Sequence, residues 1–351
     1  MKVNKNILLE AMKKCLPGVE KGNSIIEGAD TFVFSEKKVQ SYNDYISITV
    51  PFDLDLEGSV KSIDFFKLVS KLKEDDFDIE VNDNKWNIKN GTSKISINLL
   101  DNEINNYIKV LNIEKLEWLD LDDSFFEGLK LCIIQNNPFP HSGIFVNRKI
   151  IISTDSMRVN FFDLNKKMRP FLIDDYVAKE LLKFESIKQY SVADGWVYFK
   201  SEEIIFSCRC KDHSSYPFEH LFSQREVFLK AENDICNSIS DQLIEAVDRV
   251  SVLSKELMDT RAVELTFEKD KIILFAKRES GEITETIPLK NPFNKDISIW
   301  VDVYFLLEAI KKVSDFYIKE SEFKTQSGKK VTSYGFVFYK ENYQQLVAII
   351  E

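Results

Sequence analysis

The sequence predicts an α+β protein built from three tandem repeats of one unit, in which two helices pack on antiparallel strands. Two helix types recur in the same order in each third of the chain. The remainder of each third alternates apolar and polar residues with a period of two, as strands do. One third of 351 residues is 117, which is long enough for a domain with its own core.

The first helix type begins near the start of each third. Its members share two large apolar residues, then a Glu, a small residue, an apolar residue and a charge, and they span residues 8–15, 125–132 and 243–250. Their starts are 125 − 8 = 117 and 243 − 125 = 118 residues apart. This near-equal spacing indicates an internal triplication.

The second helix type begins with an apolar residue followed by Asp, at Ile63-Asp64, Ile173-Asp174 and Val301-Asp302. Apolar residues at helical spacing follow each pair. We expect the three Asp side chains to cap these helices, because a carboxylate accepts the free backbone N–H groups of a first turn. Any soluble protein contains amphipathic helices that begin with Asp, so the repeated order carries the argument.

Turn signals separate the predicted strands. Asn90-Gly91 and Asp194-Gly195 each predict a tight hairpin. In the last third, Lys269-Asp270 and Ser280-Gly281 mark further turns, and residues 336–339 and 346–350 form a closing hairpin. The periodicity lapses near residues 103–112 and 216–227, so the predicted domains are 1–112, 113–225 and 226–351.

The charge balance limits how the chain can bind nucleic acid. Lys and Arg number 47 against 57 Asp and Glu, which gives a net charge of −10. Affinity for phosphates comes from Lys and Arg, so DNA binding requires basic residues gathered on one surface. The alternative is that the chain binds no nucleic acid.

The cysteines and the apolar runs indicate a cytoplasmic protein. Five cysteines are an odd number and are widely spread, which favours reduced thiols. We interpret Cys208 and Cys210 as alternate residues on one face of a strand, because a metal site would need two further ligands nearby. No run approaches the roughly 18–20 apolar residues of a membrane span, and no signal peptide or cofactor is expected.

Two segments resemble those of a known family. Ser153-Thr154-Asp155-Ser156-Met157-Arg158-Val159 is similar to the Ala-Thr-Asp-Gly-His-Arg-Leu segment of the bacterial DNA polymerase III beta subunit, the beta sliding clamp. The segment at 216–222, which begins Tyr216-Pro217-Phe218, resembles that family's Phe-Pro-Asp-Tyr segment. Ser156 and Met157 replace the family's Gly and His. We interpret the chain as a diverged member, with a phage or a plasmid as a candidate source.

The resemblance implies the DNA clamp fold and a processivity factor for DNA polymerase. The expected assembly is a head-to-tail homodimeric ring that encircles duplex DNA without reading its sequence, with helices lining the hole. Its expected partners are the replicative polymerase and the clamp loader, bound through short linear motifs. No catalytic residues are expected, since the sequence has no phosphate-binding Gly-rich motif, metal-binding His pair or nucleophile elbow.

The DNA-facing residues that the resemblance implies are mostly basic side chains on the two helix types, with Lys21 and Gln135 in loops. Any single one of these lysines can equally be part of a solvated helix face. The set is Lys13, Lys14, Lys21, Lys67, Lys71, Lys130, Gln135, Lys179, Lys183, Arg249, Lys311 and Lys312.

The resemblance also implies a pocket for partner peptides between the second and third domains. Its residues are Thr154, Ser156, Met157, Arg158, Val159, Pro217, Phe222, Ala348, Ile349 and Ile350. Two alternatives stay open: Arg158 can form a structural salt bridge within the sheet, and Leu346 and Val347 can belong to a final core strand. The implied dimer contact joins Ile95, Ile97 and Leu99 of one subunit to Val252 and Leu253 of the other.

Two other functions remain as hypotheses. The first is a clamp-like interaction scaffold that keeps the fold and the pocket but does not encircle DNA; the changes at Ser156 and Met157 leave room for it. The second is an enzyme whose site a single sequence does not reveal.

Overall fold

The computed structural model describes residues 1–22, 26–82, 84–100, 103–134, 142–230, 234–257, 260–324 and 330–350. The chain divides into two compact units. The first unit comprises Met1–Phe126 and Phe171–Lys211, and the second comprises Glu127–Pro170 and Asp212–Glu351. Each unit is described by itself.

The helical segments of the first unit are short and are joined by strands. They are α1 (Lys5–Cys15), η1 (Leu16–Gly18), α2 (Ser62–Ser70), α3 (Glu103–Val110), η2 (Ile113–Lys115) and α5 (Asp175–Leu181). The strands are β1 (Lys2–Asn4), β2 (Thr31–Ser35), β3 (Lys38–Tyr42), β4 (Ile46–Pro51), β5 (Gly58–Lys61), β6 (Asp76–Asn82), β7 (Lys85–Asn90), β8 (Ser93–Asn98), β9 (Leu119–Asp120), β12 (Gln189–Ala193), β13 (Trp196–Lys200) and β14 (Ile205–Arg209).

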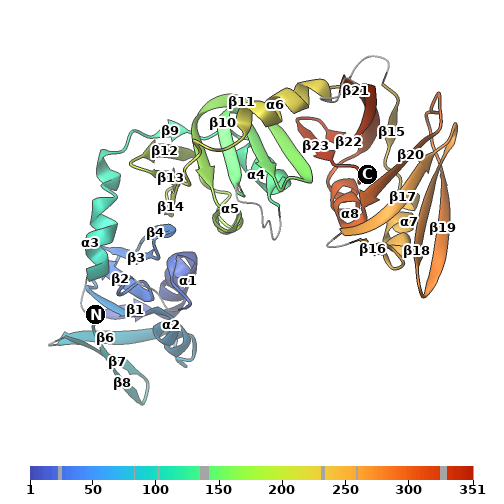
Figure 1. Ribbon diagram of the computed structural model, residues 1–351. Coiled ribbons are helices and arrows are strands. Elements are labelled where there is room, and N and C mark those ends of the chain that lie inside the picture. The colour runs from blue at the N-terminus through green and yellow to red at the C-terminus, as the bar shows by residue number, and fades with distance from the viewer. Residues whose placement is uncertain are drawn as a thin grey trace. The chain divides into compact units, whose positions relative to one another are not determined.

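Two antiparallel sheets organise the first unit (Figure 1). One has the order β1-β6-β7-β8, and the other has the order β5-β2-β3-β4-β14-β13-β12-β9. The Asn90-Gly91 hairpin is confirmed, since Asn90 pairs with Ser93 across it. The Asp194-Gly195 hairpin is confirmed as well, and both of its turn residues have positive φ, as a type I′ turn requires.

The second unit holds the remaining elements. Its helices are α4 (Phe125–Cys132, which starts at the edge of the first unit), α6 (Phe218–Val227), α7 (Asp241–Ser251) and α8 (Val303–Lys312). Its strands are β10 (Ile144–Thr154), β11 (Arg158–Ile173), β15 (Cys236–Ser238), β16 (Lys255–Leu257), β17 (Thr260–Phe267), β18 (Lys271–Arg278), β19 (Gly281–Pro288), β20 (Ile297–Asp302), β21 (Asp315–Lys324), β22 (Lys330–Lys340) and β23 (Tyr343–Val347).

Two further sheets form the second unit. One has the order β10-β11-β23-β22-β21-β15, and the other has the order β16-β17-β18-β19 with β20 paired to β17. The closing hairpin is confirmed between β22 and β23, but β23 ends at Val347 rather than Ile350. No helix of the described part of the chain is long and apolar enough to cross a membrane.

The predicted recurrence of helices is confirmed. The first type is α1, α4 and α7, and the second is α2, α5 and α8. Asp174 and Asp302 cap their helices, each accepting the backbone N–H of the residue two positions on. The prediction for Asp64 is wrong: α2 already starts at Ser62, so Asp64 lies inside the first turn, where its charge still opposes the positive end of the helix dipole.

Both segments where the periodicity lapses are largely helical, and the sequence analysis predicted neither helix. α3 forms because Ile104, Ile108 and Leu111 recur at helical spacing and are buried against Trp196 and Tyr198. α6 occupies most of the second lapse and buries Leu221, so its apolar face is narrow.

The sheets extend across the predicted domain limits. β4 pairs with β14, with Ile48 opposite Phe206, and β11 pairs with β23, with Val159 opposite Leu346. The strands between residues 113 and 225 are thereby divided between the two units. The domain limits 1–112, 113–225 and 226–351 stay a prediction.

Candidate peptide-binding site

A cavity of about 460 Å³ opens in the second unit where five chain segments meet. The turn between β10 and β11 provides one side, β20 and β22 provide others, and the residues after β23 cross between them. Its lining residues are Ser156, Met157, Arg158, Val159, Gln224, Phe228, Ser298, Ile299, Trp300, Thr332, Tyr334, Gly335 and all of residues 346–350.

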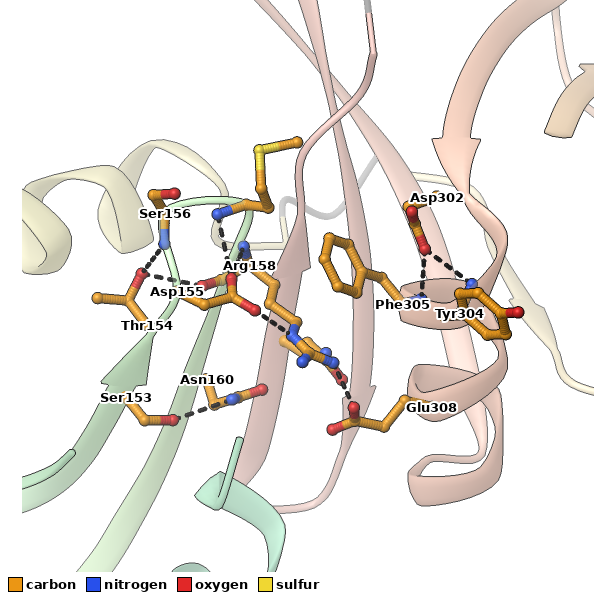
Figure 2. Close-up of polar contacts among 12 residues, drawn as sticks. Ser153, Thr154, Asp155, Ser156, Arg158, Asn160, Asp302, Tyr304, Phe305 and Glu308 are labelled. Carbon is orange, nitrogen blue, oxygen red and sulfur yellow. Dashed lines mark hydrogen bonds and ion pairs between the residues drawn. The ribbon is translucent and has the colours of Figure 1, made fainter. Parts of the chain in front are cut away.

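The turn from β10 to β11 is fixed by its own polar side chains (Figure 2). The Thr154 hydroxyl donates to the Arg158 carbonyl at 2.9 Å and accepts from the Ser156 N–H at 3.2 Å. The Asp155 carboxylate accepts from the N–H groups of Met157 and Arg158, at 3.1 and 2.9 Å. Ser156 has φ of 72°, which explains why the related family segment has Gly at this position.

Arg158 extends from this turn toward α8 (Figure 2). Its Nε donates to Asp155 at 2.7 Å, its Nη1 donates to Glu308, and its guanidinium lies 4.4 Å from the ring centre of Phe305. The side chain is only 5% exposed. Arg158 therefore forms structural ion pairs, but to the turn and to α8 rather than within the sheet, and it also lines the cavity.

Glu308 connects this network to a second cation. Its Oε1 lies 2.6 Å from the Lys312 Nζ, which also donates to the Leu131 carbonyl of α4 at 3.0 Å. Burial works to raise the pKa of the Glu308 carboxyl, but the charges of Lys312 and Arg158 outweigh burial and lower that pKa. Burial works to lower the pKa of Arg158, and Glu308 and Asp155 together raise it. Both groups are thus held in their charged forms.

The residues after β23 cross the cavity as a strap. The Ala348 N–H donates to the Met157 carbonyl at 2.7 Å, and the Ile350 N–H donates to the Trp300 carbonyl at 2.7 Å. These two bonds attach the strap to the β10–β11 turn on one side and to β20 on the other. Leu346 and Val347 belong to β23 and are buried, as the alternative for a core strand expects, while they also line the cavity.

The structure brings together most of the residues expected at the pocket. Ser156, Met157, Arg158 and Val159 meet Ala348, Ile349 and Ile350 at the cavity. Thr154, Pro217 and Phe222 are not among its lining residues. The Thr154 hydroxyl holds the turn by its hydrogen bond to the Arg158 carbonyl. Pro217 precedes α6, and the Phe222 ring stacks on Phe218 with 5.7 Å between the ring centres.

Sequence reasoning missed several lining residues. Trp300 lies in β20 (Ile297–Asp302), a strand with alternating burial. It is half-buried beside the buried Ile299 and Val301, so a Trp at the outward position of an alternating strand was the available signal. Phe228 and Tyr334 carried no such signal, because they depend on the packing of α6 against β22.

The expected DNA-facing residues separate into two groups. Lys14, Lys183, Arg249 and Lys312 form ion pairs with Glu203, Glu180, Glu285 and Glu308 respectively. The other lysines are exposed and have no ion pair within the described residues: Lys13, Lys21, Lys67, Lys71, Lys130, Lys179 and Lys311. In the first unit, Lys13, Lys14, Lys21 and Lys183 surround one hollow of about 690 Å³. Gln135 lies outside the described residues.

The expected dimer-contact residues lie beside unpaired sheet edges. β8, with the half-buried Ile95 and Ile97, is the edge of its sheet, and Leu99 follows it. In the second unit β19 is a sheet edge, and Leu253 lies near its first residue, Gly281. Val252 is 68% exposed, which is unusual for a large aliphatic side chain.

The interpretation of the cysteine pair needs a correction. Cys208 is buried in β14, but Cys210 lies after that strand ends at Arg209, so the two residues do not alternate within one strand. Burial raises the pKa of the Cys210 thiol to about 11, which keeps it protonated and unreactive at neutral pH.

Comparison with solved structures reveals matches along the entire chain. A DNA polymerase sliding clamp from Bacillus subtilis covers 100% of this chain and 98% of its own, with a TM-score of 0.79 and 18% identity. The DNA polymerase III beta chain from Streptococcus pneumoniae covers 100% and 99%, with a TM-score of 0.80 and 19% identity. The beta subunit from DNA polymerase of Streptococcus pyogenes covers 100% and 99%, with a TM-score of 0.81 and 14% identity.

Comparison by sequence finds a match over only part of the chain. No curated protein matches the chain. The model of the DNA polymerase III beta subunit, C-terminal domain, matches residues 225–331, which include β20 and α8 beside the cavity. The identity to these solved structures is low, at 14–19%. The whole chain thus has the α+β fold of the bacterial sliding clamps, and residues 225–331 match the model of the C-terminal domain of the DNA polymerase III beta subunit.

Proposed function

We propose that this protein is a processivity factor that encircles duplex DNA as a head-to-tail homodimeric ring and has no catalytic site. The full-length match in fold to bacterial sliding clamps carries the proposal. In the ring, the helices face the DNA and hold its phosphates loosely through lysines, without reading bases. We also assign it to the cytoplasm, with the replicative polymerase and the clamp loader as partners.

Ring closure in this proposal joins β8 of one subunit to the β19 edge of the other. An unpaired strand edge offers a row of free N–H and C=O groups, which invites pairing with another chain. β8 is an edge strand of the first unit and β19 is an edge strand of the second, so two copies related head to tail form the same β8–β19 pair twice.

Partner binding in this proposal uses the cavity between the β10–β11 turn and the strap at residues 348–350. The cavity has apolar walls and a few polar groups at its rim, which is the usual composition of a peptide pocket. Short motifs with aliphatic or aromatic anchors and one hydrogen-bonding side chain fit such a lining. The polymerase and the loader compete for the same cavity.

Retention on DNA tests encirclement. The protein is loaded on a nicked circular duplex and on the same duplex after linearisation, and its residence time on each is measured at moderate salt. A ring leaves the linear duplex by sliding off the ends, so retention on the circle should be at least tenfold longer. Equal retention on both substrates would contradict encirclement.

A clamp-like scaffold that does not encircle DNA is the second candidate. Four of the expected DNA-facing cations are already paired with carboxylates of the same chain, which lowers the positive charge available to phosphates. A monomer in sedimentation at micromolar concentration, together with intact peptide binding, would favour the scaffold.

A further inference from the structure

β22 is much longer than the strand that pairs with it at the cavity. β22 spans Lys330–Lys340, whereas β23 spans only Tyr343–Val347. The last pair between them is Phe336 with Val347. From residue 335 back to residue 330, the edge of β22 on that side has no strand beside it within the described residues.

The hairpin register fixes which backbone groups point to this open edge. Lys340 pairs with Tyr343 across a two-residue turn, so these two residues exchange both of their hydrogen bonds. The pattern alternates along an antiparallel ladder, which gives Phe338 and Phe336 the same orientation as Lys340. Continued along β22, the N–H and C=O groups of Tyr334 and Thr332 also point to the open side.

The open edge borders the proposed peptide cavity. Thr332, Tyr334 and Gly335 are lining residues, and the chain after Val347 turns away from β22 to reach Met157 and Trp300. The Phe228 ring packs on Gly335, where an added Cβ would lie 2.2 Å from a ring atom. A glycine is therefore required for Phe228 to close one side of this space.

We infer that a partner peptide binds here by adding a strand to β22, in the place that β23 leaves open beyond Val347. An extended flank of the peptide pairs with the backbone of Tyr334 and Thr332, and its apolar anchors occupy the neighbouring cavity. Main-chain pairing provides affinity without demanding particular side chains, whereas the anchors provide specificity. This inference rests on the proposed peptide-binding function and specifies how the peptide is held.

Backbone methylation of a probe peptide tests strand addition directly. The probe is a fluorescein-labelled dodecapeptide with one Gln, one Leu and one Phe in its anchor half and alternating Thr and Ser in its other half. A second probe carries the two halves in reverse order. Four consecutive amides of the Thr/Ser half are N-methylated one at a time, and affinity for the full chain is measured by anisotropy.

Strand addition predicts a period of two in the results. Methylation of an amide that pairs with β22 should weaken binding about five- to tenfold, because one hydrogen bond is lost. Methylation of the amides between them should change affinity less than twofold, since they point away from β22. Uniform small effects along the Thr/Ser half of both probes would overturn the inference.

A proline substitution tests the same edge from the protein side. Tyr334→Pro removes the N–H that faces the open edge and should weaken the unmethylated probe about fivefold relative to Tyr334→Ala, which keeps that N–H. Thr332→Pro is the second variant, for use if Tyr334→Pro melts below wild type. Equal affinity of the proline and alanine variants at Tyr334, with both folded, would contradict strand addition.

The proposed function and this inference fail in different ways. Probes that bind the wild type but show neither the alternating pattern nor the proline effect would exclude strand addition and leave the pocket standing. Probes that do not bind at all, in either order, would remove the peptide pocket and the inference together.

Discussion

Arg158 and Glu308, 150 residues apart in the sequence, form an ion pair that joins the cavity turn to α8. The pair is shielded from water, since the Arg158 side chain is 5% exposed and that of Glu308 is 27% exposed. Lys312 on the same helix shares the Glu308 carboxylate. The turn that lines the cavity is therefore attached to a helix that carries an expected DNA-facing cation.

Glu308→Gln should destabilise the protein at neutral pH by about 2 kcal/mol, because it leaves the buried Arg158 without a full counter-charge. The pKa of Glu308 is lowered by folding, so its contribution is present above the ordinary value of 4.5 and is lost as the pH falls through the lowered pKa. The difference between wild type and variant should shrink on acidification, as measured by urea unfolding at several pH values.

Glu245→Gln is the matched control, since its pair with Arg249 is exposed and long, at 3.7 Å. That variant should change stability by less than about 0.5 kcal/mol at every pH. If Glu308→Gln behaved like this control, the pair with Arg158 would carry no stabilisation.

Val252→Asp combined with Leu253→Asp should convert the proposed dimer to monomers, because two charges at an apolar contact have no partners there. Sedimentation velocity at micromolar concentration measures the change. Val110→Asp is the control, because Val110 is 80% exposed on α3 and lies outside the expected contact. A wild type that is already monomeric would contradict the ring.

Changing Lys13, Lys71 and Lys179 together to Glu should shorten residence on circular DNA and reduce its salt dependence, because unpaired helix lysines are lost. Lys85, Lys89 and Lys167 changed to Glu provide the control, since they are exposed on strands and the change in net charge is identical. Sedimentation should show the dimer intact in both variants. Equal losses would mean that net charge alone, and not the helix face, governs retention.

Deleting residues 349–351 should abolish binding of a polymerase-derived peptide in a calorimetric titration, because it removes Ile349 and Ile350 of the strap and the contact with Trp300. Met157→Ala should weaken binding by about 1–2 kcal/mol, since it removes apolar contact area and no charge. The dimer should persist in both. Unchanged affinity in both variants would place the partner site elsewhere.

Ser156→Gly should raise the melting temperature slightly, with Ser156→Ala as its control. A residue other than glycine at φ of 72° carries a strain of about 1 kcal/mol, which glycine relieves at some cost in unfolded-state entropy. Alanine keeps the strain and should leave the melting temperature unchanged or lower. A lower melting temperature for the glycine variant would show that the turn is not strained.

The sequence predicted the features that depend on local pattern. Helix spacing identified the six repeated helices, and turn chemistry identified the hairpins at Asn90 and Asp194. The start of α2 was mistaken because its N-cap residue is Lys61, whose side chain makes no capping hydrogen bond. α3 and α6 were missed because their burial depends on contacts distant in sequence: Ile104 and Ile108 of α3 pack on Trp196 and Tyr198, and α6 buries Leu221.

The candidate site was predictable only in part. The turn at 154–159 carries a sequence resemblance, which also implied the residues after β23, and the cavity joins the two. The ends of β22 and β23, and therefore the open edge, follow from the register of a hairpin. No local sequence pattern predicts that β23 ends while its partner β22 continues.

The strands of the middle repeat, residues 113–225, belong to two different sheets. The segment that is repeated in the sequence is therefore not the segment that folds as one unit. Its strands β10 and β11 depend on β23, which the ribosome completes almost 190 residues after Arg158, whereas its strands β12, β13 and β14 depend on β4, which is finished early. We expect the eight-stranded sheet to gain protection from hydrogen exchange first and the β10–β11 pair to wait for the end of synthesis. An isolated middle repeat, cut at the repeat boundaries, would expose two unpaired strand edges and should aggregate.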